Sequence, residues 1–352
     1  MRRTVCAALA LLAAGVAGCE PGASRARLYV TSGFTDELLE LDAKRGEVLA
    51  RVTVDPRRGE TDEPHGIALA PGGSHLYLTV SHGEPTLWKY ELPGPRLVGR
   101  ARLGTAGAGR IGITPDGSRA FVPDYYRAGA GVTSEVAVVR LSDLEVTDRI
   151  PICAAPHDAA VSPSGELVAV TCSLSDEVVL LDAVTLEEAG RFFVGSDPGS
   201  PGSPRYRPLN LAWSPCGAAI YVTLHAVGEV RSFGSDGEPA GAATVGAGPA
   251  QLAVTEDGLT LVVANRRDGS ASLLDAVNVE ELTRVPLGAE HPHGVALSTD
   301  QSVAFITYEG ATDTPGGVVA LDLERAEVLW RAEAGAYTLG IVYAGPQVPV
   351  TP

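Results

Sequence analysis

A short strand motif recurs seven times between residues 28 and 307. Measured at its second residue, successive copies lie 48, 44, 48, 52, 41 and 43 residues apart. The copies are residues 28–31, 76–79, 120–123, 168–171, 220–223, 261–264 and 304–307. Propeller repeats are roughly 40 to 50 residues long, and each repeat forms one blade. One repeat domain over residues 27–345 is therefore expected, rather than the two domains that the length alone suggests.

Three further strands accompany each copy of the motif. An earlier strand begins at a Pro-His-Gly or related sequence and ends in a tight turn, as in Pro64–Leu69 followed by Pro71–Gly73. A third strand ends in aspartate and a fourth follows, as in residues 38–42 and 47–52. The pattern predicts an all-β, seven-bladed propeller with four-stranded blades. The strand at residues 337–343 has no partner after it, so it should close the first blade beside residues 28–30.

The repeat carries a family resemblance in its second strand. Tyr29-Val30-Thr31-Ser32 and Tyr221-Val222-Thr223-Leu224 resemble the YVTN-repeat β-propellers, which are related to the quinoprotein amine dehydrogenase β-chain-like superfamily. The resemblance covers nearly the whole chain after residue 26. It implies the propeller fold, and several members of the family are exported or surface proteins of unknown biochemical role, so the resemblance implies more about fold than about function.

The first residues look like an export signal. Two arginines precede an apolar run too short to span a bilayer, and Val16-Ala17-Gly18-Cys19 resembles a bacterial lipobox. We expect a lipoprotein signal peptide at residues 1–18, lipidation of Cys19 and a tether over residues 19–26. An ordinary secretory signal is the alternative. Glu20 favours the outer membrane, on its periplasmic or cell-surface side. Residues 346–352 should be a tail.

Charge and missing motifs exclude several functions. The chain has 27 basic and 43 acidic residues, a formal charge of −16, so nucleic acid is a poor partner. There is no Gly-x-Ser-x-Gly, Walker, His-Glu-x-x-His or Cys-x-x-Cys-His sequence. We therefore expect a monomeric binding protein for an envelope protein or a small ligand, and leave enzymatic activity open.

Histidine is unevenly placed among the repeats. His65, His157 and His293 share one repeat position at the start of an innermost strand, and His82 and His225 follow second strands. All five should lie on the face that carries the blade-to-blade connections, here called the top face. Three readings stay open: rings bonded to neighbouring backbone, a non-metal ligand site, and a transition-metal site at His65, His157 and His293.

Other groups are expected on the same face. Asp124 and Tyr125 follow the second strand of the third unit and could serve a ligand site. The rival function is a metal-dependent oxidoreductase or a lactonase-like hydrolase that uses a histidine-lined funnel. Cys153 and Cys172 should lie beside His157, where a disulfide is favoured over free thiols or shared metal ligation.

Overall fold

The computed structural model describes residues 25–57, 59–125, 131–310 and 314–346. Within these ranges every regular element is a β-strand. No described segment forms a helix long and apolar enough to cross a membrane. The predicted signal peptide and Cys19 lie outside the described residues, as does most of the tail.

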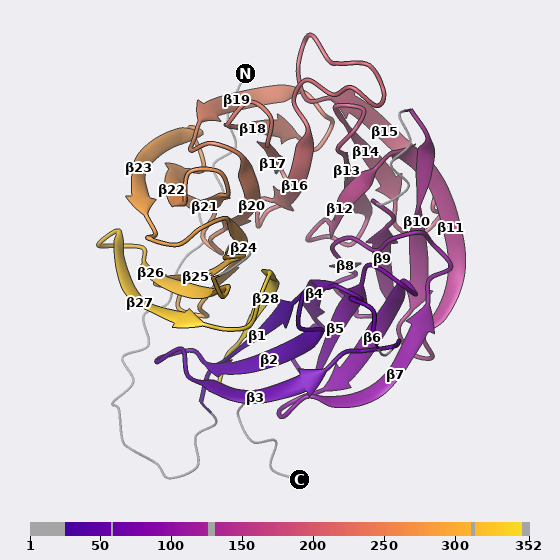
Figure 1. Ribbon diagram of the computed structural model, residues 1–352. Coiled ribbons are helices and arrows are strands. Elements are labelled where there is room, and N and C mark those ends of the chain that lie inside the picture. Colours follow the sequence, from indigo (N-terminus) through magenta and orange to yellow (C-terminus); the bar gives the residue numbers. More distant parts are fainter. Residues whose placement is uncertain (1–24, 58, 126–130, 311–313, 347–352) are drawn as a thin grey trace.

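The strands form seven separate four-stranded antiparallel sheets arranged in a ring (Figure 1), which confirms the predicted propeller. From the axis outward, blades 1 to 3 are β28 (Thr338–Ala344), β1 (Arg27–Ser32), β2 (Glu37–Asp42), β3 (Val48–Thr53); β4 (Pro64–Leu69), β5 (His75–Val80), β6 (Thr86–Glu91), β7 (Arg96–Arg102); and β8 (Gly112–Ile113), β9 (Arg119–Pro123), β10 (Thr133–Arg140), β11 (Glu145–Ala154). Blades 4 and 5 are β12 (Pro156–Val161), β13 (Leu167–Cys172), β14 (Glu177–Asp182), β15 (Glu188–Phe193); and β16 (Pro208–Trp213), β17 (Ala219–Leu224), β18 (Glu229–Gly234), β19 (Pro239–Thr244). Blades 6 and 7 are β20 (Pro249–Val254), β21 (Thr260–Asn265), β22 (Ser270–Asp275), β23 (Glu280–Pro286); and β24 (Pro292–Leu297), β25 (Val303–Tyr308), β26 (Gly317–Asp322), β27 (Glu327–Glu333).

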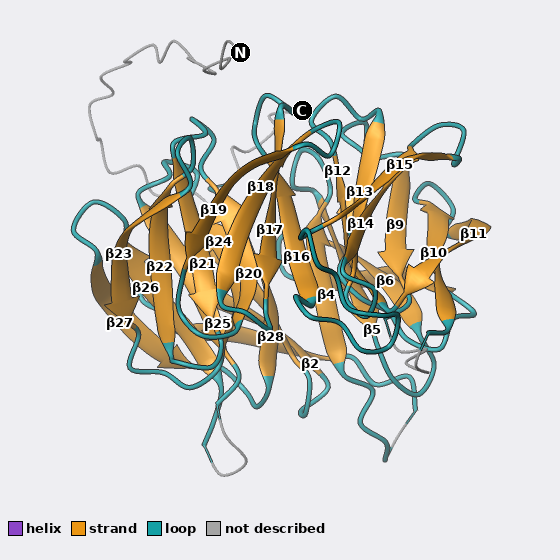
Figure 2. Cartoon of the chain, turned by 90° about the horizontal axis from the view of Figure 1, so that it is seen from above, coloured by secondary structure: helices purple, strands orange, loops and turns teal. Residues whose placement is uncertain are grey.

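Blade 1 is closed by the two ends of the described chain. β28 pairs with β1 from Arg27 opposite Ala344 to Ser32 opposite Thr338. The C-terminal strand therefore takes the innermost place, as predicted, and gives blade 1 its fourth strand. Figure 2 shows the strands upright, with loops gathered at the two ends of the ring.

The hydrophobic core lies between neighbouring blades. Residues of the middle strands face the next sheet, so each core cluster draws on two adjacent blades; Tyr29 of blade 1 packs with Leu76 and Trp88 of blade 2. Alternating outer strands such as β3 are half exposed. The core is thus a ring of apolar layers around the axis, in keeping with repeats that cannot bury a face alone.

The threonine of the Tyr-Val-Thr motif joins adjacent blades. Thr79 Oγ1 accepts the Gly66 N–H of its own blade at 2.8 Å and donates to the Gly109 carbonyl of the next blade at 3.0 Å. Equivalent bonds to the next inner strand are made by Thr31, Thr171, Thr223 and Thr307. A buried hydroxyl in this register explains why five of the seven copies of the motif end in threonine.

Candidate functional site

A β-bulge aims the repeated histidines at the propeller axis. Pairing of β4 with β5 jumps from Pro64 to Ile67, so His65 and Gly66 leave the ladder. The same jump opens β12, β16, β20 and β24. A bulge changes the direction of side chains locally. Proline, which has no N–H to donate, is tolerated at the first residue of a strand. The bulge explains why a residue that begins an inner strand turns away from the sheet.

The three histidines at this position converge. The His65 ring centroid lies 6.3 Å from that of His157 and 5.8 Å from that of His293, and the ring pairs are close to perpendicular. Tyr125 lies against both His65 and His157, with centroid distances of 5.4 Å. Together with Glu63 and His82, these side chains are here called the histidine cluster.

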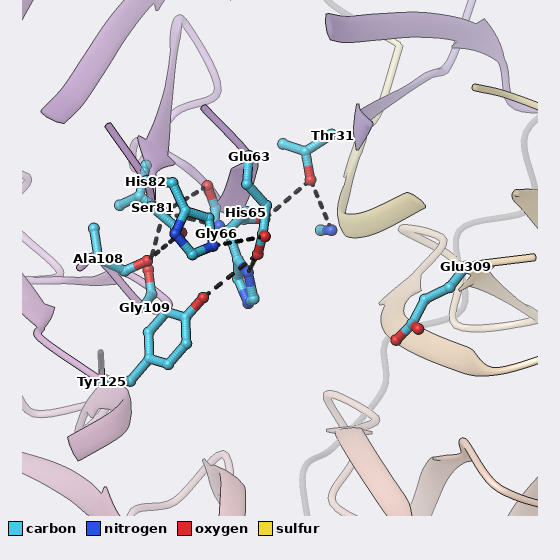
Figure 3. Close-up of polar contacts among 12 residues, drawn as sticks. Thr31, Glu63, His65, Gly66, Ser81, His82, Ala108, Gly109, Tyr125 and Glu309 are labelled. Carbon is cyan, nitrogen blue, oxygen red and sulfur yellow. Dashed lines mark hydrogen bonds and ion pairs between the residues drawn. The ribbon is translucent and has the colours of Figure 1, made fainter. Parts of the chain in front are cut away.

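Glu63 links the histidine cluster and was not found from the sequence. Its carboxylate accepts from His65 Nδ1 at 3.2 Å and pairs with His82 Nε2 at 2.8 Å, while the Tyr125 hydroxyl donates to it at 3.4 Å. Figure 3 shows these side chains gathered on one side, with Glu309 apart on the other. Burial on its own would raise the pKa of Glu63, but the bonds from His65 and His82 outweigh it and lower that pKa to about 2. The bond to Glu63 raises the pKa of His82.

Glu63 occupies a position that recurs in six blades. The residue before each of these inner strands has a left-handed backbone, with φ of 53° at Glu63 and 54° at Arg207. The equivalent residues are Ala155, Gly248, His291 and Tyr337. The carbonyl of each accepts an N–H from the loop after the second strand, such as Ser81 N–H bonded to Glu63 at 3.0 Å. Aligning the repeats on this residue is the sequence signal that could have revealed Glu63.

Two of the predicted histidines are bonded to a neighbouring blade. His157 Nδ1 lies 2.9 Å from the Leu209 carbonyl, and His225 Nδ1 lies 3.2 Å from the Pro249 carbonyl. Burial, and after it the charge of His65, lowers the pKa of His157 to about 3, and burial lowers the pKa of His225 to about 4. Both rings are therefore neutral at physiological pH. Their bonds agree with the first of the three interpretations, in which the rings are bonded to neighbouring backbone.

His65 and His293 each have an unpaired ring nitrogen. His65 is 6% exposed and His293 is 8% exposed, yet His65 Nε2 and His293 Nδ1 have no hydrogen-bond partner among the described residues. Burial and the neighbouring His65 hold the pKa of His293 well below its ordinary value. Buried polar atoms almost always form a hydrogen bond, so each one that does not requires an explanation. These two nitrogens are the places where a ligand would complete the histidine cluster.

Several arginines lie near His225 and His293. The charges of Arg207, Arg266 and Arg267 all act on His225, and those of Arg110 and Arg266 act on His293. Arg266 donates to both carboxylate oxygens of Glu309 at 2.6 Å. Arg266 and Glu309 also line a pocket of about 590 Å³ with the stacked rings of Phe34 and Tyr337. A pocket of this size suits a small molecule.

The remaining predicted groups have structural contacts. Asp124 is fully buried and accepts the Ala106 N–H at 3.1 Å, a bond that holds the chain approaching blade 3. Cys153 and Cys172 are joined by a disulfide between the last strand of blade 3 and the second strand of blade 4. Among the described residues no three His, Cys, Asp or Glu side chains are grouped so that they could hold one metal ion.

Comparisons with known proteins identify the fold. No protein-family model matches the chain, and no curated protein matches its sequence. The structure is similar to the periplasmic gluconolactonase of Pseudomonas aeruginosa, with a TM-score of 0.72 and 18% identity over 92% of this chain and 100% of that one. A putative 6-phosphogluconolactonase from Bacteroides fragilis gives a TM-score of 0.69 and 12% identity over 91% and 98%. Hydrazine synthase from Kuenenia stuttgartiensis gives 0.66 and 17% over 83% and 93%. These identities support a shared propeller fold.

Proposed function

We propose that this propeller binds a polyhydroxylated small molecule at the histidine cluster on its top face. The observation that carries the proposal is the pair of unpaired, buried nitrogens, His65 Nε2 and His293 Nδ1. A carboxylate can only accept, so His65 donates from Nδ1 to Glu63, and its Nε2 is left for a ligand. One hydroxyl, which both donates and accepts, could bridge His65 Nε2 and His293 Nδ1.

Further acceptors support a ligand with several hydroxyls. His157 and His225 donate from Nδ1 to backbone carbonyls, which leaves Nε2 of each neutral ring as an acceptor. Neighbours in the fold include proteins named as lactonases, whose substrates by name derive from sugar acids.

Isothermal titration calorimetry with D-glucitol, D-glucose and D-gluconate tests the proposal. Wild-type protein should bind at least one of them, and His65→Phe with His293→Phe should abolish binding, because phenylalanine fills the site without a ring nitrogen. His75→Phe is the matched control, since His75 begins β5 at the bottom end of blade 2. If no member of the panel binds, or if the double variant binds as well as wild type, the proposal is wrong. Elemental analysis of the same preparation tests the transition-metal hypothesis.

A lactonase-like activity is the second candidate, and the contacts of Glu63 favour it. An ionised carboxylate holding His82, His65 and Tyr125 is a suitable arrangement for moving protons. Water would add to the lactone carbonyl, the ring C–O bond would break, and the ring oxygen would take up a proton. Proton release from D-glucono-1,5-lactone above the spontaneous rate, and its loss in His82→Gln, would establish this activity.

We also propose that the protein is held at the envelope by lipid on Cys19. The lipobox-like sequence before Cys19 supports this, together with the short segment that separates it from β1 at Arg27.

A further inference from the structure

Arg207 and Arg267 differ from the other described arginines because their guanidinium groups have no partner among the described residues. The other guanidinium groups in the described part of the chain form an ion pair, donate to a carbonyl or lie over an aromatic ring. No described carboxylate lies within ion-pairing distance of either Arg207 or Arg267. The chain has 43 acidic residues that could pair with arginines, yet none of the described ones pairs with Arg207 or Arg267.

The two arginines lie at the top face of adjacent blades, 5 and 6. Arg207 directly precedes β16 in blade 5, at the position that Glu63 holds in blade 2. Gly248 holds that position in blade 6, and a Cβ built there would lie 2.6 Å from Cγ of Arg267. Glycine thus leaves the space that the Arg267 stem fills. The Arg267 N–H bond to Ala247 at 2.9 Å fixes the backbone of the loop.

Both arginines are exposed, and no described carboxylate offsets their charge. Partial burial of the guanidinium group, and after it repulsion from Arg267 and Arg266, lowers the pKa of Arg207. Arg266 is already neutralised by Glu309, and neutral His225 supplies no counter-charge. Guanidinium groups bind carboxylates and phosphates through paired N–H donors, and such bonds are stronger than neutral ones. An acid group between the two arginines would relieve their repulsion.

We propose that Arg207 and Arg267 form an anion subsite that binds the carboxylate or phosphate of a polyhydroxylated ligand. This inference rests on the proposed function, because the same ligand would place its hydroxyls against His65 and His293. The ligand class narrows accordingly from polyols to sugar acids and sugar phosphates.

Matched ligands test the subsite. D-glucitol and D-gluconate differ only at C1, where one has a hydroxymethyl group and the other a carboxylate, and 6-phospho-D-gluconate adds a phosphate. Calorimetry on wild type should show at least about tenfold tighter binding of one acid than of D-glucitol. Arg207→Gln with Arg267→Gln should remove that preference and leave D-glucitol binding unchanged. Whichever acid loses more affinity identifies the group that the subsite prefers.

Arg45→Gln is the charge-matched control, because Arg45 lies in the turn between β2 and β3 on the opposite face. Applied with Arg96→Gln, another exposed residue, it equals the charge change of the double variant. Equal binding of all three ligands, or an acid preference that survives in the Arg207 and Arg267 variant, would overturn the subsite. Titration with inorganic phosphate separates the two proposals: arginine-dependent phosphate binding without binding of any polyol would leave the subsite standing and reject the polyol function.

Discussion

Glu63 and Arg207 occupy the same repeat position in blades 2 and 5 and carry opposite charges. Both precede an innermost strand and both have a left-handed backbone, with φ of 53° and 54°. Aspartates of the preceding blades hold them, since Asp36 accepts the Glu63 N–H at 3.1 Å and Asp176 accepts the Arg207 N–H at 2.9 Å. A repeated backbone therefore presents an acidic group on one side of the axis and a basic group on the other.

The first prediction concerns the inter-blade hydroxyl of Thr79. Thr79→Val should lower the free energy of unfolding by roughly 2–3 kcal/mol, because the buried Gly66 N–H and Gly109 carbonyl lose their partner. Urea unfolding followed by circular dichroism measures the change. Thr79→Ser keeps the hydroxyl and should retain most of the stability; equal losses in the two variants would show that the hydroxyl does not matter.

Ala155 tests the cost of the left-handed position. Its φ is 50°, a conformation that glycine adopts without a Cβ clash. Ala155→Gly should therefore raise the free energy of unfolding by up to about 1 kcal/mol. Ala160→Gly, at an ordinary position of the following strand β12, should lower it by about 0.5–1 kcal/mol. Destabilisation by both changes would contradict the strain argument.

The pH dependence of stability should reveal neutral His157. Because its pKa is about 3 when folded and about 6.5 when unfolded, the unfolded chain takes up a proton that the folded chain does not between these values. The stability that wild type has relative to His157→Gln should fall by about 1.4 kcal/mol per pH unit below pH 6.5. Urea unfolding of both proteins at pH 7.5, 6.5 and 5.5 gives this difference. A difference that stays constant with pH would mean that His157 titrates normally.

Glu63→Gln should lower the pKa of His82. The carboxylate stabilises the protonated ring through a 2.8 Å contact, and glutamine has no charge to do so. NMR titration of the His82 ring should show its pKa falling toward the ordinary value of about 6.5. Glu47→Gln, in the turn between β2 and β3 on the opposite face, makes the same change in net charge and should leave the His82 titration as it is.

Cys19→Ser tests the proposed anchor. The variant should move from the membrane fraction to the soluble fraction, because two lipid attachments give stable anchoring that one chain does not. Fractionation and mass spectrometry of the N-terminal peptide measure the outcome. A variant that stays with the membrane, or a wild-type Cys19 without lipid, would reject the proposal.

The propeller could be predicted because its signals are periodic. Strand length, turn residues and the Tyr-Val-Thr motif repeat often enough to be counted, and residues 337–343 were assigned to the first blade because one inner strand was missing at the N-terminus. The shared register of His65, His157 and His293 likewise predicted one face. The partners of each ring were not predictable, because Glu63 follows an irregular loop and its bonds depend on how blade 3 brings Tyr125 against His65 and Glu63.

The pairing of β1 with β28 also determines which part of the fold forms last. Arg27 and Ala344 pair across almost the whole length of the chain, and contacts that distant form late because loop closure must come first. During synthesis β1 therefore waits with an unpaired edge until the last strand has been made. A chain that stops before β28 exposes the edge of β1 to proteases and to other incomplete chains. Only a chain that includes β28 covers this edge.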